Sequence, residues 1–225
     1  MTDRFQNYRE LQGANLEGID YRIETAIRSR NHESIGQSAL ERAKSIIILG
    51  VHAGGIEPGT SELARSIAGE DFSLYLFEGI TGNNKVLHIT STHFDEPRCT
   101  ELVKNHHSSV SLHGFIESPS DPCVYVGGKD IGLKQQILSN LMNNGFSTEI
   151  NTGKYAATAA GNICNRTSSG QGVQIEIAKG LRTQFFEDYS SRRGRENTTA
   201  SFESFVKAIR NTLLNDSLGR QDHYR

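Results

Sequence analysis

The sequence feature that most constrains the fold is residues 45–52, SIIILGVH, an almost unbroken run of aliphatic residues. A strand with one solvent-facing side alternates apolar and polar residues, whereas a strand covered on both faces is apolar nearly throughout. Residues 45–52 are therefore predicted to form an inner strand of a sheet that is covered on both faces.

The remainder of the chain alternates between strand-like and helical patterns. Further strands are predicted at residues 74–77, 86–90, 110–115, 123–126, 146–150 and 173–177. Helices are predicted at residues 60–68, 95–105, 130–143 and 201–215. This order indicates an α/β fold in which a central, mixed β-sheet is flanked by helices.

The length of 225 residues is suited to a single domain, residues 1–225, with a well-formed core. We expect residues 1–17 and 216–225 to be flexible ends. The polar residues 27–44 are expected to form an exposed segment, and residues 187–201, which are rich in charged residues, Ser, Asn and Thr, a mobile loop.

The charge balance argues against nucleic acid as a partner. The formal net charge is −2, from 24 Lys and Arg against 26 Asp and Glu. Proteins that bind a nucleic-acid backbone usually carry a basic excess or a basic stripe. The one dense basic stretch, residues 191–195, has acidic neighbours. The oligomeric state is not indicated by any pattern.

Neither a membrane partner nor secretion is indicated. No apolar run approaches the ~20 residues that span a bilayer, and the polar N-terminus lacks the apolar core of a signal peptide. We therefore expect a soluble, cytoplasmic protein. The three cysteines, Cys99, Cys123 and Cys164, include no C-x-x-C pair and are interpreted as small buried residues.

The first motif with chemical potential follows the inner strand. His52 ends the strand, two glycines follow, and Glu57 stands just before the helix predicted at residues 60–68. Ligand sites of α/β sheets form where strands end and helices begin. The two side chains could converge on one point, although a capped strand-to-helix turn without any ligand would give the same pattern.

A second strand ends in the same way, at His113 followed by Gly114. A strand-end histidine is more often a hydrogen-bonded structural residue. Together with His52 and Glu57, however, it would complete a set of two imidazoles and one carboxylate, which is a common arrangement of catalytic zinc with an open fourth position.

A third motif lies in residues 173–177, VQIEI, where Gln174 and Glu176 share one face and the aliphatic residues the other. An acid between two isoleucines is either a paired structural carboxylate or a catalytic one. A partly desolvated glutamate beside a metal site is suited to general-base work. Both interpretations of Glu176 stay open at this point.

Residues 87–97 hold two histidines and two acids within a short span. They could hold a second metal ion, orient the ligands of the first, or bind substrate. Asp95 could equally cap a helix. His106 and His107, at the end of a predicted helix, are expected on the surface.

At these residues the chain resembles the phage and Bacillus poly-γ-glutamate hydrolase family, some members of which are labelled phage-related replication proteins. The matching segments are residues 52–63, HAGGIEPGTSEL; 90–97, TSTHFDEP; 111–114, SLHG; and 172–177, GVQIEI, with 162–166, NICNR, as a fifth. The first two are long and specific. The resemblance runs from about residue 18 to residue 186, and residues 27–44 look like an insertion relative to the family pattern.

The resemblance implies a fold similar to that of zinc carboxypeptidases and a single Zn²⁺ ion on His52, Glu57 and His113. It further implies that Glu176 is the catalytic base and that the reaction is hydrolysis of γ-glutamyl amide bonds in poly-γ-glutamate. A phage-encoded member would reach the polymer after host lysis. The insertion at residues 27–44 could alter the preferred substrate length.

Poly-γ-glutamate carries a free carboxylate on every residue, so the site needs cations. Arg166 and Arg182 are the best candidates, because a guanidinium grips a carboxylate with two hydrogen bonds. Lys129 and Arg98 are weaker candidates. His93 and Asn165, which lie in the matching segments, are the other predicted substrate contacts.

Two other functions remain open from the sequence. A zinc amidohydrolase that deacylates small N-acyl amino acids would use the same metal and base on a different substrate. A non-catalytic phage replication or nucleic-acid-binding protein would need no metal and would bind DNA in a salt-sensitive way.

Overall fold

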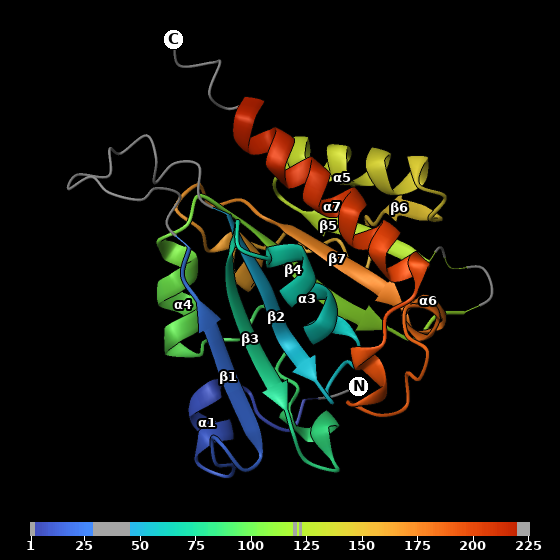
Figure 1. The fold of residues 1–225 in the computed structure, drawn as a ribbon. Coiled ribbons are helices and arrows are strands. Elements are labelled where there is room, and N and C mark those ends of the chain that lie inside the picture. Colours follow the sequence, from blue (N-terminus) through green and yellow to red (C-terminus); the bar gives the residue numbers. More distant parts are fainter. Residues whose placement is uncertain (1–2, 29–45, 119–120, 122, 220–225) are drawn as a thin grey trace.

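Seven strands form one mixed sheet in the order β1-β3-β2-β4-β7-β5-β6 (Figure 1). The computed structural model describes residues 3–28, 46–118, 121 and 123–219. The strands are β1 (Tyr21–Ala26), β2 (Ile46–Gly54), β3 (Ser73–Gly79), β4 (Ser108–Phe115), β5 (Val124–Gly128), β6 (Thr148–Ile150) and β7 (Val173–Ala178). The helices are α1 (Tyr8–Gln12), α3 (Thr60–Ala68), α4 (Pro97–Lys104), α5 (Ile131–Asn143), α6 (Lys179–Gln184) and α7 (Ala200–Gly219), with 3-10 turns η1 (Asn84–Leu87), η2 (Ile163–Asn165) and η3 (Gly194–Glu196).

The centre of the sheet is parallel, and its flanks are antiparallel. Strands β3, β2, β4 and β7 run in the same direction, whereas β1 pairs antiparallel with β3 and β5 antiparallel with β7. The carboxyl ends of the four central strands therefore meet at one edge of the sheet. This is the edge at which α/β proteins build their sites.

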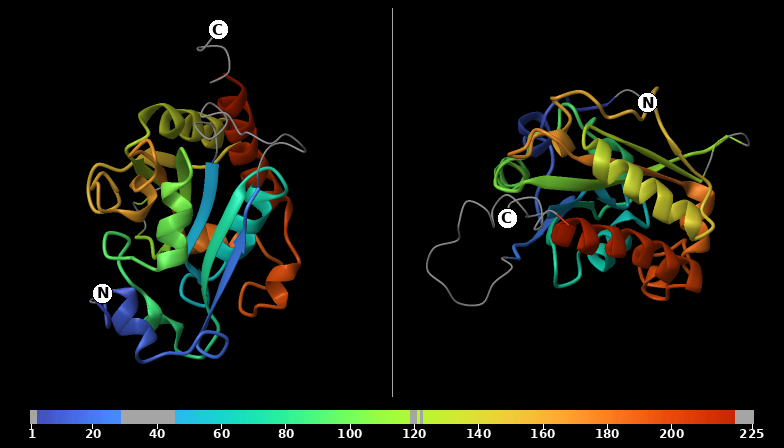
Figure 2. Two further views of the ribbon diagram at one scale, coloured as in Figure 1. Left: turned by 90° about the vertical axis from the view of Figure 1, so that its left-hand side faces the viewer. Right: turned by 90° about the horizontal axis from the view of Figure 1, so that it is seen from above.

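A layer of helices covers each face of the sheet. One apolar core joins the sheet to α3, α5 and α7, and a second joins the opposite face to α1 and α4. Figure 2 shows α5 and α7 side by side on one side of the sheet and α4 on the other. Residues 46–49 of β2 are almost completely buried, as the unbroken aliphatic run predicts. The predicted α/β class, with a mixed central sheet flanked by helices, is confirmed.

One predicted strand is wrong. Residues 86–90 form no strand, because the chain makes a 3-10 turn at Asn84–Leu87. Leu87 and Ile89 are buried in the second core, so their alternation reflects a loop packed onto the sheet. The helix predicted at residues 95–105 begins at Pro97, and its N-cap is Glu96. Asp95 does not cap it and instead accepts a hydrogen bond from the backbone N–H of Tyr8 at 2.7 Å.

Two segments expected to be mobile are packed. Phe5, Tyr8 and Leu11 are buried, so the part of residues 1–17 that the structure describes belongs to the second core. Within residues 187–201, the buried Arg195 guanidinium pairs with Glu62 of α3 at 2.9 Å. Both segments are mostly polar, but a few buried residues anchor each of them to the rest of the protein.

Two further segments extend into residues that the structure does not describe. The predicted insertion at residues 27–44 lies outside the described residues from position 29 onward. Helix α7 continues to Gly219, beyond the predicted end at residue 215, and residues 220–225 are not described. None of the helices in the described ranges combines the length and apolarity required to cross a bilayer.

Candidate metal centre

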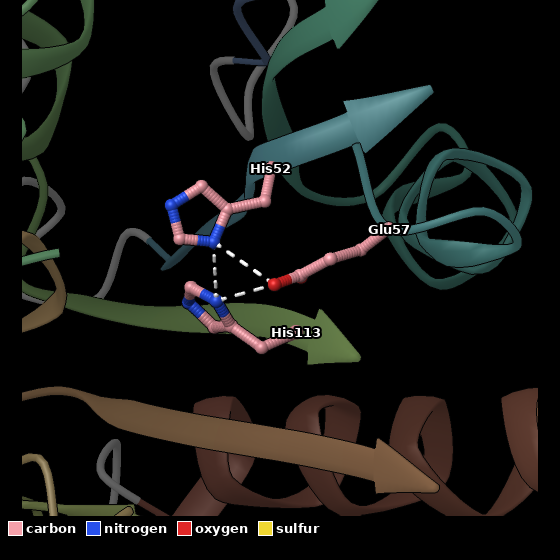
Figure 3. A group of neighbouring side chains, drawn as sticks. All are labelled: His52, Glu57 and His113. Carbon is pink, nitrogen blue, oxygen red and sulfur yellow. Dashed lines mark hydrogen bonds and ion pairs between the residues drawn. The ribbon is translucent and has the colours of Figure 1, made fainter. Parts of the chain in front are cut away.

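Three side chains predicted as metal ligands converge at the carboxyl edge of the central strands. His52 lies near the end of β2, His113 near the end of β4, and Glu57 in the turn between β2 and α3 (Figure 3). One ligand atom from each residue lies within 4.8 Å of the others. The two histidines are almost fully buried, so the cluster is shielded from bulk water on the protein side.

The geometry brings three lone-pair donors to one point. His52 Nδ1 lies 3.0 Å from His113 Nδ1 and 3.2 Å from the Oε1 atom of Glu57. His113 Nδ1 lies 3.7 Å from the Oε2 atom of Glu57. Figure 3 shows both rings turned toward the carboxylate. Two imidazole nitrogens and a carboxylate oxygen this close together repel one another unless a cation or a proton lies among them.

The far side of each ring is fixed by a hydrogen bond. His52 Nε2 lies 2.8 Å from the backbone oxygen of Ile89, which can only accept, so Nε2 carries the hydrogen and Nδ1 is left to bind a metal. His113 Nε2 lies 2.8 Å from the Ser111 hydroxyl. Metal-bound histidines usually have their second nitrogen held in this way. The donor set therefore fits a divalent metal ion.

The pKa shifts in the cluster also indicate that a positive charge is favoured there. Burial opposes ionisation of Glu57, but the charge and hydrogen bond of His52 lower the Glu57 pKa to about 2. Burial likewise opposes a charged His52, but the Glu57 carboxylate raises the His52 pKa above its ordinary value. Burial lowers the pKa of His113 to about 3. The shifts of Glu57 and His52 both favour a positive charge among the three donors, and a bound metal ion would supply one.

The turn that presents Glu57 depends on close backbone contacts. Gly54 has φ +67°, and a Cβ on it would lie 2.5 Å from the backbone oxygen of Gly79. Helix α3 spans residues 60–68 as predicted, and its N-cap is Gly59. The Ser61 hydroxyl accepts a hydrogen bond from the backbone N–H of Gly54 at 2.7 Å.

The Glu57 carboxylate also bridges two strands. Its Oε2 atom accepts the backbone N–H of Gly114 at 2.8 Å, and Gly114 directly follows His113 in β4. The backbone of the residue after His113 thus helps to hold the Glu57 carboxylate between the two rings.

Glu176 lies beside this cluster. It pairs with His113 across β4 and β7, so both side chains are on the same face of the sheet. Burial, followed by the charge of Glu57, raises the pKa of Glu176 to about 8. Gln174 donates to its Oε1 atom at 2.8 Å, and Asn162 donates to Gln174 at 2.9 Å. The carboxylate is held in place by a chain of amides.

His52 is also contacted by a residue of the segment 87–97, whose role the sequence left open. The His88 ring stacks on that of His52 with 4.0 Å between centroids, and His88 Nδ1 lies 2.6 Å from the Oδ1 atom of Asp3. The other Asp3 oxygen accepts the backbone N–H of Thr90 at 2.6 Å. These contacts favour one of the roles considered for residues 87–97, orientation of a predicted ligand, which stays a prediction. No sequence pattern pointed to Asp3.

This support leads to a prediction about metal affinity. Asp3→Ala should free the His88 ring and the loop that carries Ile89, both of which fix His52. Partners of metal-bound histidines are worth about 10- to 100-fold in affinity, and Asp3 acts one step further out, so we expect zinc binding to weaken about 3- to 10-fold. Competition with a chromogenic chelator measures this. Asp71→Ala, which removes the Arg210 ion pair on the opposite face, is the control; equal affinities in both variants would contradict the prediction.

Arg182 is near the site, but its guanidinium is already hydrogen-bonded within the protein. Its side chain is buried, and its guanidinium donates to the backbone oxygens of Ile177, Pro58 and Phe115. Tyr189 supplies a further contact through its hydroxyl at 3.0 Å. These contacts favour a structural role, so a direct contact of Arg182 with substrate stays a prediction.

Arg166 makes a similar set of contacts from a more exposed position. It donates to the backbone oxygens of Gly161, Phe94 and Thr92 at 2.8, 3.1 and 2.8 Å. It thereby joins the two loops that hold the predicted substrate contacts His93 and Asn165. A substrate contact of Arg166 also stays a prediction.

The other predicted contacts differ in burial. Asn165 is buried and donates to the backbone oxygens of Ala157 and Ala159, whereas His93 is exposed. Among the weaker cation candidates, Arg98 pairs with Glu17 and Glu96. His106 was expected on the surface but is buried, with Nδ1 2.6 Å from the backbone oxygen of Leu102.

Comparison with known proteins places the chain among hydrolases. A family model described as poly-gamma-glutamate hydrolase matches residues 5–208. The solved structure of a bacteriophage poly-gamma-glutamate hydrolase superposes with a TM-score of 0.86 at 36% identity and covers 97% of this chain and 99% of that chain.

Bacillus proteins are also similar. The UPF0714 protein YndL of Bacillus subtilis (strain 168) is 34% identical over 95% of this chain and 79% of its own length. The SPbeta prophage-derived UPF0714 protein YoqZ of the same strain is 36% identical over 96% of this chain and 73% of its own length. A solved zinc-free apo form of YndL superposes with a TM-score of 0.82 at 33% identity and covers 96% of this chain and 99% of that chain.

Proposed function

Because this chain belongs to the poly-gamma-glutamate hydrolase family, we propose that it is a zinc-dependent enzyme that cleaves γ-glutamyl amide bonds of poly-γ-glutamate. The observation that carries the proposal is the convergence of His52, Glu57 and His113 within 4.8 Å at the carboxyl edge of the sheet. A solved relative described as zinc-free supports zinc as the metal.

The three converging residues would hold the metal, with His52 and His113 binding through Nδ1 and Glu57 through a carboxylate oxygen. Two histidines and one glutamate form a common protein ligand set of catalytic zinc. When bound, zinc supplies a Lewis acid that polarises a carbonyl and makes water more acidic. The positive charge would also favour the ionised form of Glu176, because an opposite charge lowers the pKa of a carboxyl group.

Glu176 is the proposed general base. Its register position beside His113 and its hydrogen bond from Gln174 support this role. It would accept a proton from the attacking water and deliver a proton to the leaving nitrogen as the amide bond breaks. The step is balanced. The hydroxyl of the water molecule is added to the carbonyl carbon, and its proton goes to the leaving nitrogen, which departs as a neutral amine.

A depletion and readdition experiment tests the proposal. Protein stripped with a chelator should lose hydrolysis of poly-γ-glutamate, and one equivalent of Zn²⁺ per chain should restore it. Chain shortening is followed by size-exclusion chromatography, and poly-α-glutamate serves as the matched polymer with the same charge. Cleavage of small N-acyl amino acids without cleavage of the polymer would replace the proposal by the deacylase alternative. Full activity in stripped protein would remove the metal from the reaction.

A further inference from the structure

A substrate with a carboxylate on every residue requires a cation close to Glu176, and the described structure offers one besides the two arginines predicted from the sequence. The guanidinium groups of Arg166 and Arg182 each donate hydrogen bonds to three backbone oxygens. Lys154 is exposed, and in the described part of the chain no ion pair with a carboxylate is formed by it. Its ammonium lies 3.2 Å from the hydroxyl of Tyr155 and donates to it.

The segment that carries Lys154 lies on the same face of the sheet as Glu176. Tyr125 pairs with Glu176 across β5 and β7, so Tyr125 and, two residues on, Gly127 face the same way as Glu176. A Cβ on Gly127 would lie 2.3 Å from the backbone oxygen of Tyr155. The segment after β6 therefore crosses β5 directly on the face that carries the proposed base.

An aromatic patch extends from Lys154 to Tyr125, the residue paired with Glu176 across β5 and β7. We define this patch as Phe115, Tyr125 and Tyr155, whose ring centroids lie 5.4 to 5.7 Å apart. The two tyrosines are only partly buried. The ammonium of Lys154 lies 4.9 Å from the centre of the Tyr155 ring. The charge of Lys154 acts on Glu176 against the effects of burial and Glu57, which agrees with this proximity.

The segment is held firmly enough to form a binding surface. Asn165 donates to the backbone oxygens of Ala157 and Ala159 at 2.7 and 2.9 Å, and the backbone N–H of Gly128 donates to Ala156 at 2.8 Å. Asn165 was predicted to contact substrate itself, but these bonds give it a role in holding the segment that carries Lys154.

We propose that Lys154 and the aromatic patch form a subsite for one γ-glutamyl residue of the polymer, in which the ammonium binds the α-carboxylate and the rings contact the side-chain methylenes. The inference rests on the proposed function. A γ-linked residue has its two methylenes in the polymer backbone and its α-carboxylate on a short branch, which matches an apolar wall with a cation at its border. An α-linked residue would place its carboxylate at the end of the methylenes instead.

The test compares substrates as well as variants. Lys154→Ala should raise KM for poly-γ-glutamate about 5- to 20-fold, which is the range of one charge-assisted hydrogen bond at a partly exposed site, and should leave kcat within about twofold. Lys154→Arg keeps the charge and should recover most of the loss. Lys207→Ala removes the same charge from the exposed face of α7 on the opposite layer and should match wild type.

A pair of short oligomers tests whether Lys154 recognises the α-carboxylate itself. Wild-type protein should prefer tri-γ-glutamate with free α-carboxylates over the same peptide with α-carboxamides, and Lys154→Ala should lose that preference. Binding of the two peptides to zinc-stripped protein, measured by calorimetry, reports the same preference without turnover. Zinc content and melting temperature show whether each variant is folded.

The outcomes separate the two proposals. A wild-type protein that leaves poly-γ-glutamate intact overturns the proposed function. A wild type that degrades the polymer, with a Lys154→Ala protein that keeps both its KM and its preference for free carboxylates, overturns the subsite alone. A loss of kcat that is equal for both peptides would place Lys154 at the reacting amide and would also overturn the subsite.

Discussion

Replacing His113 with alanine is expected to remove measurable hydrolysis of poly-γ-glutamate and to weaken zinc binding by at least about a hundredfold. Residues that only hydrogen-bond to a metal ligand are worth about 10- to 100-fold in metal affinity, and His113 would be a direct ligand. The substitution also leaves His52 and Glu57 as a simple ion pair at 3.2 Å, which one proton satisfies without a metal. Elemental analysis of dialysed protein gives the zinc content, and polymer length gives the activity.

The control for this experiment is His107→Ala, because His107 immediately precedes β4 and so lies at the opposite edge of the sheet. It should bind one zinc ion per chain and keep its activity. His52→Ala and Glu57→Ala should behave like His113→Ala. A His113→Ala protein with full zinc occupancy would remove His113 from the ligand set, and His88, which stacks on His52, would be the residue to examine next.

The second large effect is expected at Glu176. Glu176→Gln preserves the size of the side chain and can still hydrogen-bond to Gln174, but it cannot accept a proton. Turnover should fall about 10²- to 10⁴-fold, the usual range for loss of a general base. Zinc content should stay near one per chain, since no metal ligand is changed. The variant should also be at least as stable as wild type, because it replaces a carboxyl group whose burial opposes ionisation.

Glu149→Gln is the matched control, because Glu149 lies two strands away in β6 and is exposed. It makes the same chemical change without touching the cluster. Near-normal turnover in Glu176→Gln would make Glu176 a structural acid, which was the open alternative from the sequence. A parallel loss of zinc would mean instead that Glu176 takes part in binding the metal.

The converging histidines and glutamate could be predicted because each one is marked locally. His52 and His113 both lie at the ends of aliphatic runs, with Gly54 two residues after His52 and Gly114 directly after His113. Parallel strands bring such ends to one edge of the sheet. Gly114 is a second local marker of the site, because its backbone N–H donates a hydrogen bond to Glu57. The fold class followed from the same local signals, namely the aliphatic run in β2 and the helical faces of α3, α5 and α7.

The support around the site could not be predicted, because it depends on contacts between distant segments. Asp3 acts on His88 from 85 residues away, and its sequence neighbours are polar. Lys154 lies in a segment without regular structure, and only the close approach to Gly127 places it near Glu176. Arg166 and Arg182 were identified as the important cations, but a sequence cannot reveal that their partners are backbone oxygens.

Those backbone partners have a consequence for how the family can diverge. An arginine that binds a carboxylate restricts two positions, because both side chains must be kept or exchanged together. Arg166 binds the main-chain oxygens of Thr92 and Gly161, which every amino acid provides. Substitutions at such partner positions can therefore accumulate while the arginine stays fixed, and the loops around the metal centre can drift in composition without a compensating change elsewhere.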